Sequence, residues 1–241
     1  MDRRGVVSGP WWGRLCTVIL GRTPRCLRDD EIPDAQALLY DVYFKEKGWD
    51  PPTPNPSNLR ADHDRRRFED DLTDGARWLG VFEGNTRLIG VIRVLSRNEM
   101  GRLELERYIQ LPQSLTSDGE VIELNRLAIR PTSRSRLTIV LIHLLSGWLA
   151  GQLGAQRAVI ALANKGTDVF VDAYGWRHVG LTFRYHPTDP QPVHVIRFES
   201  RDNRRIKMVA RFLFYRLRRV YKEKLLKHRR RDLHEHHPLQ Q

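Results

Sequence analysis

Cysteine is scarce in this 241-residue sequence, which contains only Cys16 and Cys26. The two lie ten positions apart and form no Cys-x-x-Cys pair. We therefore expect neither a zinc knuckle nor a dithiol redox motif, and no metal site. So few cysteines exclude a disulfide scaffold and favour a reducing compartment, which predicts a cytoplasmic protein.

Long hydrophobic runs are also missing. The longest apolar stretch, residues 137–150, is interrupted by a histidine, a serine and a glycine. It is shorter than the ~20 residues that span a bilayer. Near the N-terminus, the apolar stretch of residues 6–20 is broken by glycine, proline and arginine, unlike the core of a signal peptide. We expect no membrane span and no secretion.

The overall composition is that of a globular protein, with 40% apolar and 29% charged residues, and excludes intrinsic disorder. The formal net charge of +12 is concentrated in residues 201–241, which hold fourteen Lys and Arg against four Asp and Glu. Residues 1–200 carry a net charge of only +2. We therefore divide the chain into a loose leader at residues 1–28, a globular domain at 29–200 and a basic segment at 201–241.

Apolar residues in the basic segment recur at every third or fourth position, which predicts one amphipathic helix from about residue 203 to 227. These apolar positions are Ile206, Val209, Leu213, Leu217, Val220 and Tyr221. Such a helix can pack on the domain with its cations in solvent, lie on an anionic membrane surface through residues 203–231, or dock an acidic protein. Nucleic acid is the weakest candidate because no base-reading motif accompanies the charge.

The domain reads as alternating helices and strands. A helical pattern starts at Ile32 and stops at Gly48, and a proline-rich loop and a polar stretch follow it. The later elements are strands at 76–82 and 87–95 joined as a hairpin, a strand at 121–129, a helix at 134–153, a strand at 157–163, a helix at 167–173, and strands at 179–185 and 193–198. This order predicts an α/β fold in which helices sandwich a mixed β-sheet.

Four short segments carry a resemblance to a known family. They are Gly48-Trp49, the strand residues 88–93, the strand residues 123–129, and Tyr174-Gly175-Trp176. In their order and separation they resemble the acyl-transferring branch of the GCN5-related N-acetyltransferases, in particular acyl-homoserine lactone synthases and N-acyl amino acid synthases. Over residues 30–200 the resemblance implies that fold, no bound cofactor, and an acyl carrier protein or acyl-CoA thioester as co-substrate.

Three features bear on the substrates that the resemblance implies. Asp62 and Asp64 resemble the paired aspartates of the family in the loop before the hairpin, and are candidate acceptor-binding residues. Leu39 stands where the family tends to have an arginine, which favours an ordinary amino acid or amine over homoserine lactone synthesis. The loop 130–136 lacks the glycines of the pyrophosphate-binding loop of acetyl-CoA enzymes, which favours a carrier protein over free CoA.

Glu123 is the candidate catalytic base. An amine near its reference pKa of about 8 is mostly protonated at pH 7, and a carboxylate can remove that proton. On a regular strand Glu123 and Arg126 project to opposite faces, so they share a face only where a bulge intervenes. The resemblance implies such a bulge, which frees a backbone N–H for the thioester oxygen. We assign Arg126 and Arg93 to holding the acceptor carboxylate or orienting Glu123. The alternative is a structural ion-pair cluster.

Three further groups of residues can contact the substrates. The first group lies between a strand and a helix N-terminus and consists of Arg130, Arg134, Ser135 and Arg136. These residues can hold the phosphate of a phosphopantetheine arm, or form only a solvated basic turn. The aromatic residues Tyr43, Phe44 and Trp49 can wall the substrate pocket or belong to the core. Tyr174 and Trp176 can approach the leaving sulfur or belong to the core.

These features favour an N-acyltransferase that moves a long acyl chain from an acyl carrier protein to the amino group of an amino acid or similar small amine. The alternatives are acetyl transfer from acetyl-CoA, and an inactive fold whose basic tail binds lipid or nucleic acid. We expect a cytoplasmic protein, with the basic segment allowing peripheral attachment to the inner face of the membrane.

Overall fold

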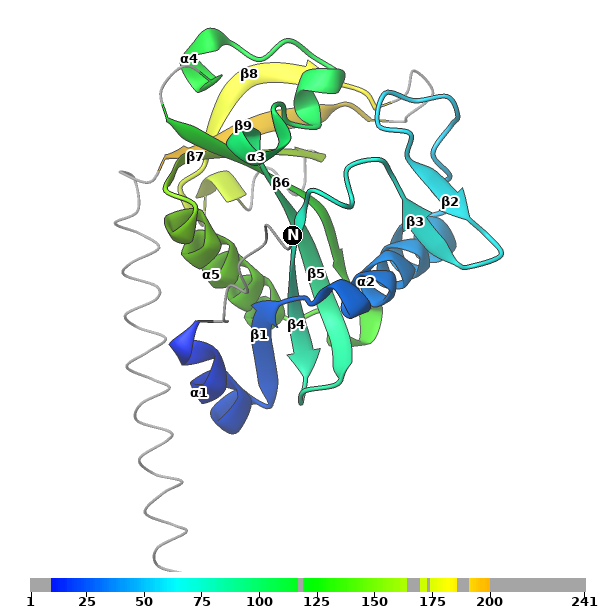
Figure 1. Cartoon of the computed structure of the whole chain (residues 1–241), viewed down its shortest axis with the longest axis vertical. Helices are drawn as coiled ribbons and strands as arrows, with labels where there is room; N and C mark the ends of the chain where they lie inside the picture. The colour runs from blue at the N-terminus through cyan, green and yellow to red at the C-terminus, as the bar shows by residue number, and fades with distance from the viewer. Residues whose placement is uncertain (1–9, 117–118, 164–169, 173, 186–190, 200–241) are drawn as a thin grey trace, which may run out of the picture.

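The computed structural model of the chain describes residues 10–116, 119–163, 170–172, 174–185 and 191–199. The described residues form one seven-stranded sheet in the order β1-β4-β5-β6-β7-β9-β8 (Figure 1). The strands are β1 (Arg22–Cys26), β4 (Arg77–Glu83), β5 (Arg87–Ser96), β6 (Glu120–Ile129), β7 (Ala155–Ala163), β8 (Arg177–Phe183) and β9 (Val193–Glu199). Only the β6–β7 pair is parallel, so the sheet is mixed as the sequence predicts.

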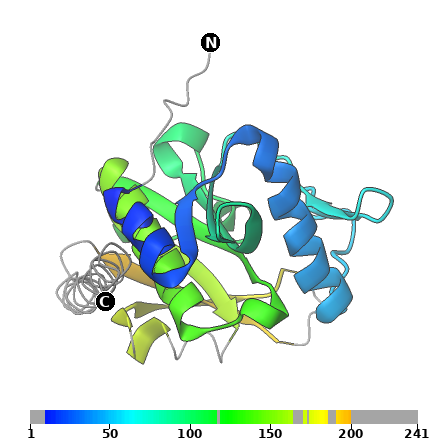
Figure 2. The same cartoon turned by 90° about the horizontal axis from the view of Figure 1, so that it is seen from below.

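Helices cover both faces of this sheet. Helices α1 (Trp11–Leu20) and α5 (Arg136–Gln152) pack on one face, and α2 (Ile32–Leu39) packs on the other (Figure 2). Each strand therefore buries side chains on both sides, in two separate hydrophobic clusters. Gly90 allows α5 to approach β5 closely, since a Cβ there would lie 3.0 Å from Ile142 and 3.2 Å from Thr138.

Short elements complete the described chain. They are the 3₁₀ turns Asp29–Glu31, Leu105–Arg107 and Pro131–Ser133, the short helices α3 (Arg97–Met100) and α4 (Gln113–Thr116), and the two-stranded ribbon of β2 (Arg60–Asp62) and β3 (Arg67–Glu69). Helix α2 continues directly into a π-helix, Tyr40–Glu46, and the chain leaves the helical path at Gly48, whose N–H donates to the carbonyl of Phe44. The positive φ of 65° at Gly48 is a conformation that glycine adopts readily, which explains the stop there.

The expectation of a loose leader is wrong for residues 11–26. Helix α1 buries Trp12 and Cys16 against the sheet, and β1 pairs antiparallel with β4. Pro24 lies within β1, and an edge strand tolerates proline because one side of its backbone needs no partner. Residues 1–9, the basic segment 201–241 and most of the helix predicted at 167–173 lie outside the described residues.

The other predicted elements are confirmed within a few residues. The hairpin is β4 and β5, and the predicted strands correspond to β6, β7, β8 and β9. The stretch 62–71, which reads as merely polar, instead contributes to the β2–β3 ribbon. Within the described ranges no helix is long and apolar enough to cross a membrane, and no cluster of His, Cys, Asp and Glu has the makeup of a metal site.

Candidate active site

A buried ionic network lies where β5 and β6 meet the loop between them. Arg93 is fully buried and uses every part of its guanidinium group. Its Nε donates to Asn125 Oδ1 at 2.8 Å, its Nη1 to both oxygens of Asp70 at 2.6 and 2.7 Å, and its Nη2 to Glu104 Oε2 at 2.8 Å. Each nitrogen of the guanidinium group therefore donates to a protein group, as the predicted role in orienting the network requires. The other predicted role, holding an acceptor carboxylate, stays a prediction.

The predicted bulge is present in β6. Val91 pairs with Ala128 and Arg93 with Asn125, so Arg126 and Leu127 together oppose Ile92 of β5. Arg126 has a φ of 53°, a left-handed conformation that is uncommon for a residue with a side chain. Its Nη2 donates to Glu104 Oε1 at 2.6 Å and to Asp70 Oδ2 at 3.1 Å, while its Nε is buried with no hydrogen-bond partner in the described structure.

Glu123 is 1% exposed, and protein donors hold both of its carboxylate oxygens. Oε2 accepts from the backbone N–H of Leu105 at 3.0 Å, and Oε1 accepts from Asn125 Nδ2 at 3.1 Å. Burial, and next the negative charge of Glu104, raise the pKa of Glu123 to about 7. A carboxylate with this pKa accepts and returns a proton at neutral pH, as a general base requires.

Asp70 and Glu104 complete the network, although the sequence pattern does not single out either one. Together with Glu123 they make three carboxylates, which face the guanidinium groups of the two arginines. The network is therefore neutral when one carboxylate holds a proton. Burial would raise the pKa of Asp70, but the guanidinium groups of Arg93 and Arg126 outweigh it and hold that pKa well below its usual range. The proton therefore belongs on Glu123 rather than on Asp70.

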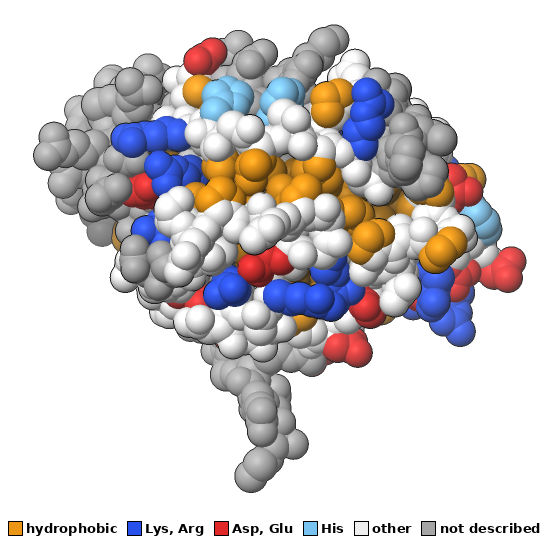
Figure 3. Space-filling model, turned by 90° about the horizontal axis from the view of Figure 1, so that it is seen from above, with side chains coloured by type: hydrophobic (Ala, Val, Ile, Leu, Met, Phe, Trp, Pro, Cys, Tyr) orange, Lys and Arg blue, Asp and Glu red, His pale blue; other side chains and the backbone are white. Residues whose placement is uncertain are grey.

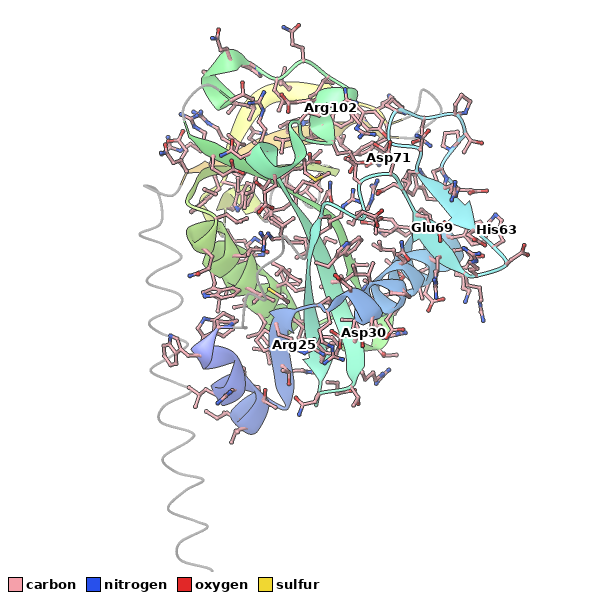
Figure 4. All side chains as sticks on the ribbon, in the orientation of Figure 1. Arg25, Asp30, His63, Glu69, Asp71 and Arg102 are labelled. Atoms are coloured by element: carbon pink, nitrogen blue, oxygen red, sulfur yellow. The ribbon has the colours of Figure 1, made fainter. Side chains whose placement is uncertain are left out.

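A cavity of about 700 Å³ opens beside Asp70, between the proline-rich loop, α2 and the β2–β3 ribbon. Its lining includes Asn55, Asn58, Glu69, Asp70, Asp71 and Asp74. Figure 4 shows Glu69 and Asp71 at this end of the molecule, with His63 on the ribbon beyond them and Arg25 and Asp30 near the start of α2. The predicted acceptor residues Asp62 and Asp64 do not line it. Asp62 Oδ1 instead accepts from Arg65 N within the ribbon turn, and Asp64 is exposed.

The predicted aromatic residues form one cluster on the α2 side. Tyr43 contacts Trp49 edge to face at 5.8 Å between ring centroids, and Trp49 stacks on Phe68 at 5.9 Å. Phe44 lies further along the π-helix against Tyr40 and His63. Tyr43 also reaches the bulge, because its hydroxyl donates to the carbonyl of Leu127 at 2.9 Å. The cluster thus packs as core while one member touches the network strand.

Three of the four predicted phosphate-binding residues already have protein partners. Both Nη atoms of Arg134 pair with the carboxylate of Glu46. Arg130 Nε donates to the carbonyl of Leu88 at 2.8 Å. Ser135 caps α5, where its hydroxyl accepts from Thr138 N at 3.2 Å. The side chain of Arg136 lies outside the described structure. Arg134 and Glu46 remain partly exposed, so an anion could compete for this pair.

Strands β6 and β7 separate beside the bulge. In the described part of the chain they pair only from Glu120 with Ala155 to Glu123 with Val159, although β6 continues to Ile129. On the face of the sheet that α2 covers, Val179, Leu181 and Phe183 of β8 are half-buried against the same hydrophobic cluster as Leu103 and Leu105. Figure 3 shows a band of hydrophobic side chains across this end of the molecule, with charged side chains along one edge.

Comparison with solved structures finds proteins of the same fold, among them an N-acyl amino acid synthase and an acyl-homoserine lactone synthase. FeeM, an N-acyl amino acid synthase from uncultured soil microbes, superposes with a TM-score of 0.51 at 16% identity, covering 74% of this chain and 90% of FeeM. The acyl-homoserine lactone synthase LasI gives 0.51 at 14%, covering 74% and 89%. TofI, solved with an inhibitor and MTA, gives 0.53 at 16%, covering 74% and 90%. This chain shares their fold. The fold class predicted from the sequence is therefore confirmed.

In sequence, by contrast, neither a protein-family model nor a curated protein matches the chain. At 14–16% identity the structural likeness establishes the fold. The chemistry must therefore be argued from the network itself.

Proposed function

We propose that the chain is an N-acyltransferase that transfers an acyl group from a thioester to the amino group of a small acceptor. The observation that carries the proposal is Glu123. It is a fully buried carboxylate with a pKa of about 7, next to a strand bulge in a fold shared with acyltransferases. A purely structural ion-pair cluster would not need a third carboxylate beside two guanidinium groups.

In the proposed reaction the acceptor ammonium group first loses one proton to solvent, and the neutral nitrogen then attacks the thioester carbonyl carbon. A C–N bond forms, and the carbonyl oxygen takes negative charge that a backbone N–H of the bulge stabilises. Glu123 takes the proton from the attacking nitrogen, directly or through one water. The C–S bond then breaks, the electron pair leaves with sulfur, and the proton on Glu123 returns to give the thiol.

The two substrates would enter from different sides. The acidic cavity beside Asp70 suits a cationic amine, which its carboxylates attract. The unpartnered Nε of Arg126 is a candidate donor for a carboxylate on that acceptor. The opening between β6 and β7 suits the acyl chain and its thioester. An acyl carrier protein is the proposed donor, and Arg134 the proposed contact for its phosphopantetheine phosphate.

Mass spectrometry of a defined reaction tests the proposal. Purified protein is incubated with palmitoyl-acyl carrier protein and pooled amino acids and amines, and N-acyl products and free carrier thiol are both measured. The proposal expects equal amounts of product and thiol, and loss of both in Glu123→Gln. Glu120→Gln is the matched control, because Glu120 is a buried carboxylate of the same strand whose oxygen accepts from Ser96 instead.

A parallel reaction with palmitoyl-CoA identifies the donor. Faster turnover with the carrier protein supports the proposed donor, and faster turnover with CoA overturns that part. No N-acyl product from either thioester with any acceptor would overturn the proposed function.

A further inference from the structure

The hydroxyl of Tyr43 makes a hydrogen bond that a packing role for its ring would not require. It donates to the carbonyl oxygen of Leu127 at 2.9 Å, although the two residues come from different layers of the fold. Tyr43 lies on the π-helix, and Leu127 lies in the β6 bulge directly after Arg126. π-Helical turns are rare and occur frequently at functional sites.

The strand geometry fixes where the backbone of Leu127 points. Backbone groups of successive strand residues face alternate neighbours, and the N–H of Arg130 faces β5, where it donates to Ile89 O at 2.9 Å. The backbone groups of Leu127, three residues earlier, therefore face the other way, toward β7. In the described chain β7 no longer pairs with β6 at this level, because the last pair is Glu123 with Val159.

The Tyr43 hydroxyl thus takes the place of the missing strand partner for Leu127. In an extended residue the carbonyl and the N–H lie on the same side of the strand. Holding the carbonyl of Leu127 therefore also keeps the N–H of Leu127 facing the opening between β6 and β7. The neighbouring Arg126 has a left-handed backbone, which is strained for a residue with a side chain, so this segment needs such anchors to keep one conformation.

The environment of Tyr43 holds its hydroxyl in place as a donor. The ring packs against Trp49 and Phe68, and the backbone N–H of Trp49 donates to the backbone carbonyl of Tyr43 at 2.9 Å. Burial raises the pKa of Tyr43 above its ordinary value, so the hydroxyl keeps its proton at neutral pH. The hydrogen bond to Leu127 therefore persists over the pH range in which Glu123 titrates.

We infer that Tyr43 is a positioning residue for the acyl transfer, whose hydroxyl holds the Leu127 peptide so that the bulge N–H faces the thioester oxygen. This inference rests on the proposed function. It adds a residue that does not touch the reacting atoms and acts through the backbone of β6. Its ring alone, as in phenylalanine, would fill the same space without holding the carbonyl.

Two conservative variants separate this role from packing. Tyr43→Phe removes the hydroxyl that bonds Leu127. Tyr40→Phe is the matched control, because its hydroxyl also lies on the π-helix but bonds His63 Nδ1 at 3.0 Å, away from the bulge. For each variant kcat, the KM of both substrates and the thermal midpoint are measured. Amide hydrogen exchange of a peptide spanning residues 120–130 is measured without substrate.

The inference expects Tyr43→Phe to lower kcat roughly ten- to hundredfold with little change in the KM of the amine. It also expects faster amide exchange across the bulge, and neither effect in Tyr40→Phe. Unchanged kcat in Tyr43→Phe, an equal loss in both variants, or a loss without faster exchange overturns the role of Tyr43. A wild-type chain that transfers no acyl group overturns the proposed function itself, which distinguishes the two failures.

Discussion

Glu104 and Glu123 are two buried carboxylates that accept hydrogen bonds from the same amide nitrogen. Nδ2 of Asn125 lies 2.7 Å from Glu104 Oε2 and 3.1 Å from Glu123 Oε1. Both guanidinium groups of the network also bind Glu104, while among the described residues Glu123 receives the amide of Asn125 and the backbone N–H of Leu105. Burial, and next the negative charge of Glu104, raise the pKa of Glu123 to about 7.

Replacing Glu104 by Gln is expected to lower the pKa of Glu123, since the neighbouring negative charge disappears. The acid limb of kcat/KM should move to lower pH in Glu104→Gln. The variant should also unfold more easily, by about 3–5 kcal/mol, because two buried guanidinium groups lose a partner. Glu106→Gln is the control, since Glu106 pairs with the partly exposed Arg97. An acid limb that stays in place or moves upward would contradict the coupling between the two carboxylates.

Glu123→Gln is expected to change how stability depends on pH. The pKa of Glu123 is about 7 in the folded chain against 4.5 ordinarily, so the folded state retains its proton longer. The unfolding free energy of the wild type should therefore fall, relative to the variant, by roughly 3 kcal/mol between pH 4.5 and 7, and level off above pH 7. Urea unfolding of both proteins across this range measures the difference. Only the change of this difference with pH is used, so a constant difference in stability between the two proteins does not matter. A wild-type minus variant difference in unfolding free energy that stays flat or rises with pH would exclude the raised pKa.

The sequence predicts those residues of the site that lie on strands, because strands are recognisable from the alternation of their side chains. Glu123 and Arg126 stand on an alternating strand, where they share a face only if a bulge intervenes, and the family resemblance implies the bulge that the structure contains. Arg93 stands on the adjacent strand of a hairpin recognisable from its turn. Strand pattern and turn chemistry are local, so a single chain reveals them.

The rest of the site lies in loops, whose sequences have no repeating pattern of apolar residues from which burial could be predicted. Asp70 stands in the run Glu69-Asp70-Asp71, which reads as a solvated acidic stretch, yet its side chain is 3% exposed. Glu104 alternates with Leu103 and Leu105, a pattern that would place it in solvent, but all three are buried. A carboxylate between two leucines is the one signal that could have marked it. Burial of both acids depends on guanidinium groups distant in sequence.

The contact between Arg134 and Glu46 gives a prediction about the donor. If Arg134 binds the donor phosphate, the phosphate must replace Glu46, so Glu46→Gln should lower the KM of the acyl carrier protein. Arg134→Ala should raise that KM several-fold, and both should leave kcat nearly unchanged. Arg65→Ala serves as control, because Arg65 lies in the exposed turn of the β2–β3 ribbon. Donor KM values that do not respond to either variant would remove Arg134 from the donor site.

The pH dependence of kcat/KM tests the central claim about Glu123 most directly. Acyl transfer is followed by thiol release from the donor at saturating acceptor, from pH 5 to 9, for the wild type and for Glu123→Gln. As a base, Glu123 must be ionised, so the wild-type value should rise with pH and level off above an apparent pKa of about 7. Glu123→Gln should lose roughly 10²–10⁴-fold in rate together with that limb. A variant that keeps the wild-type rate, or the same limb, would contradict the assignment of Glu123 as the base.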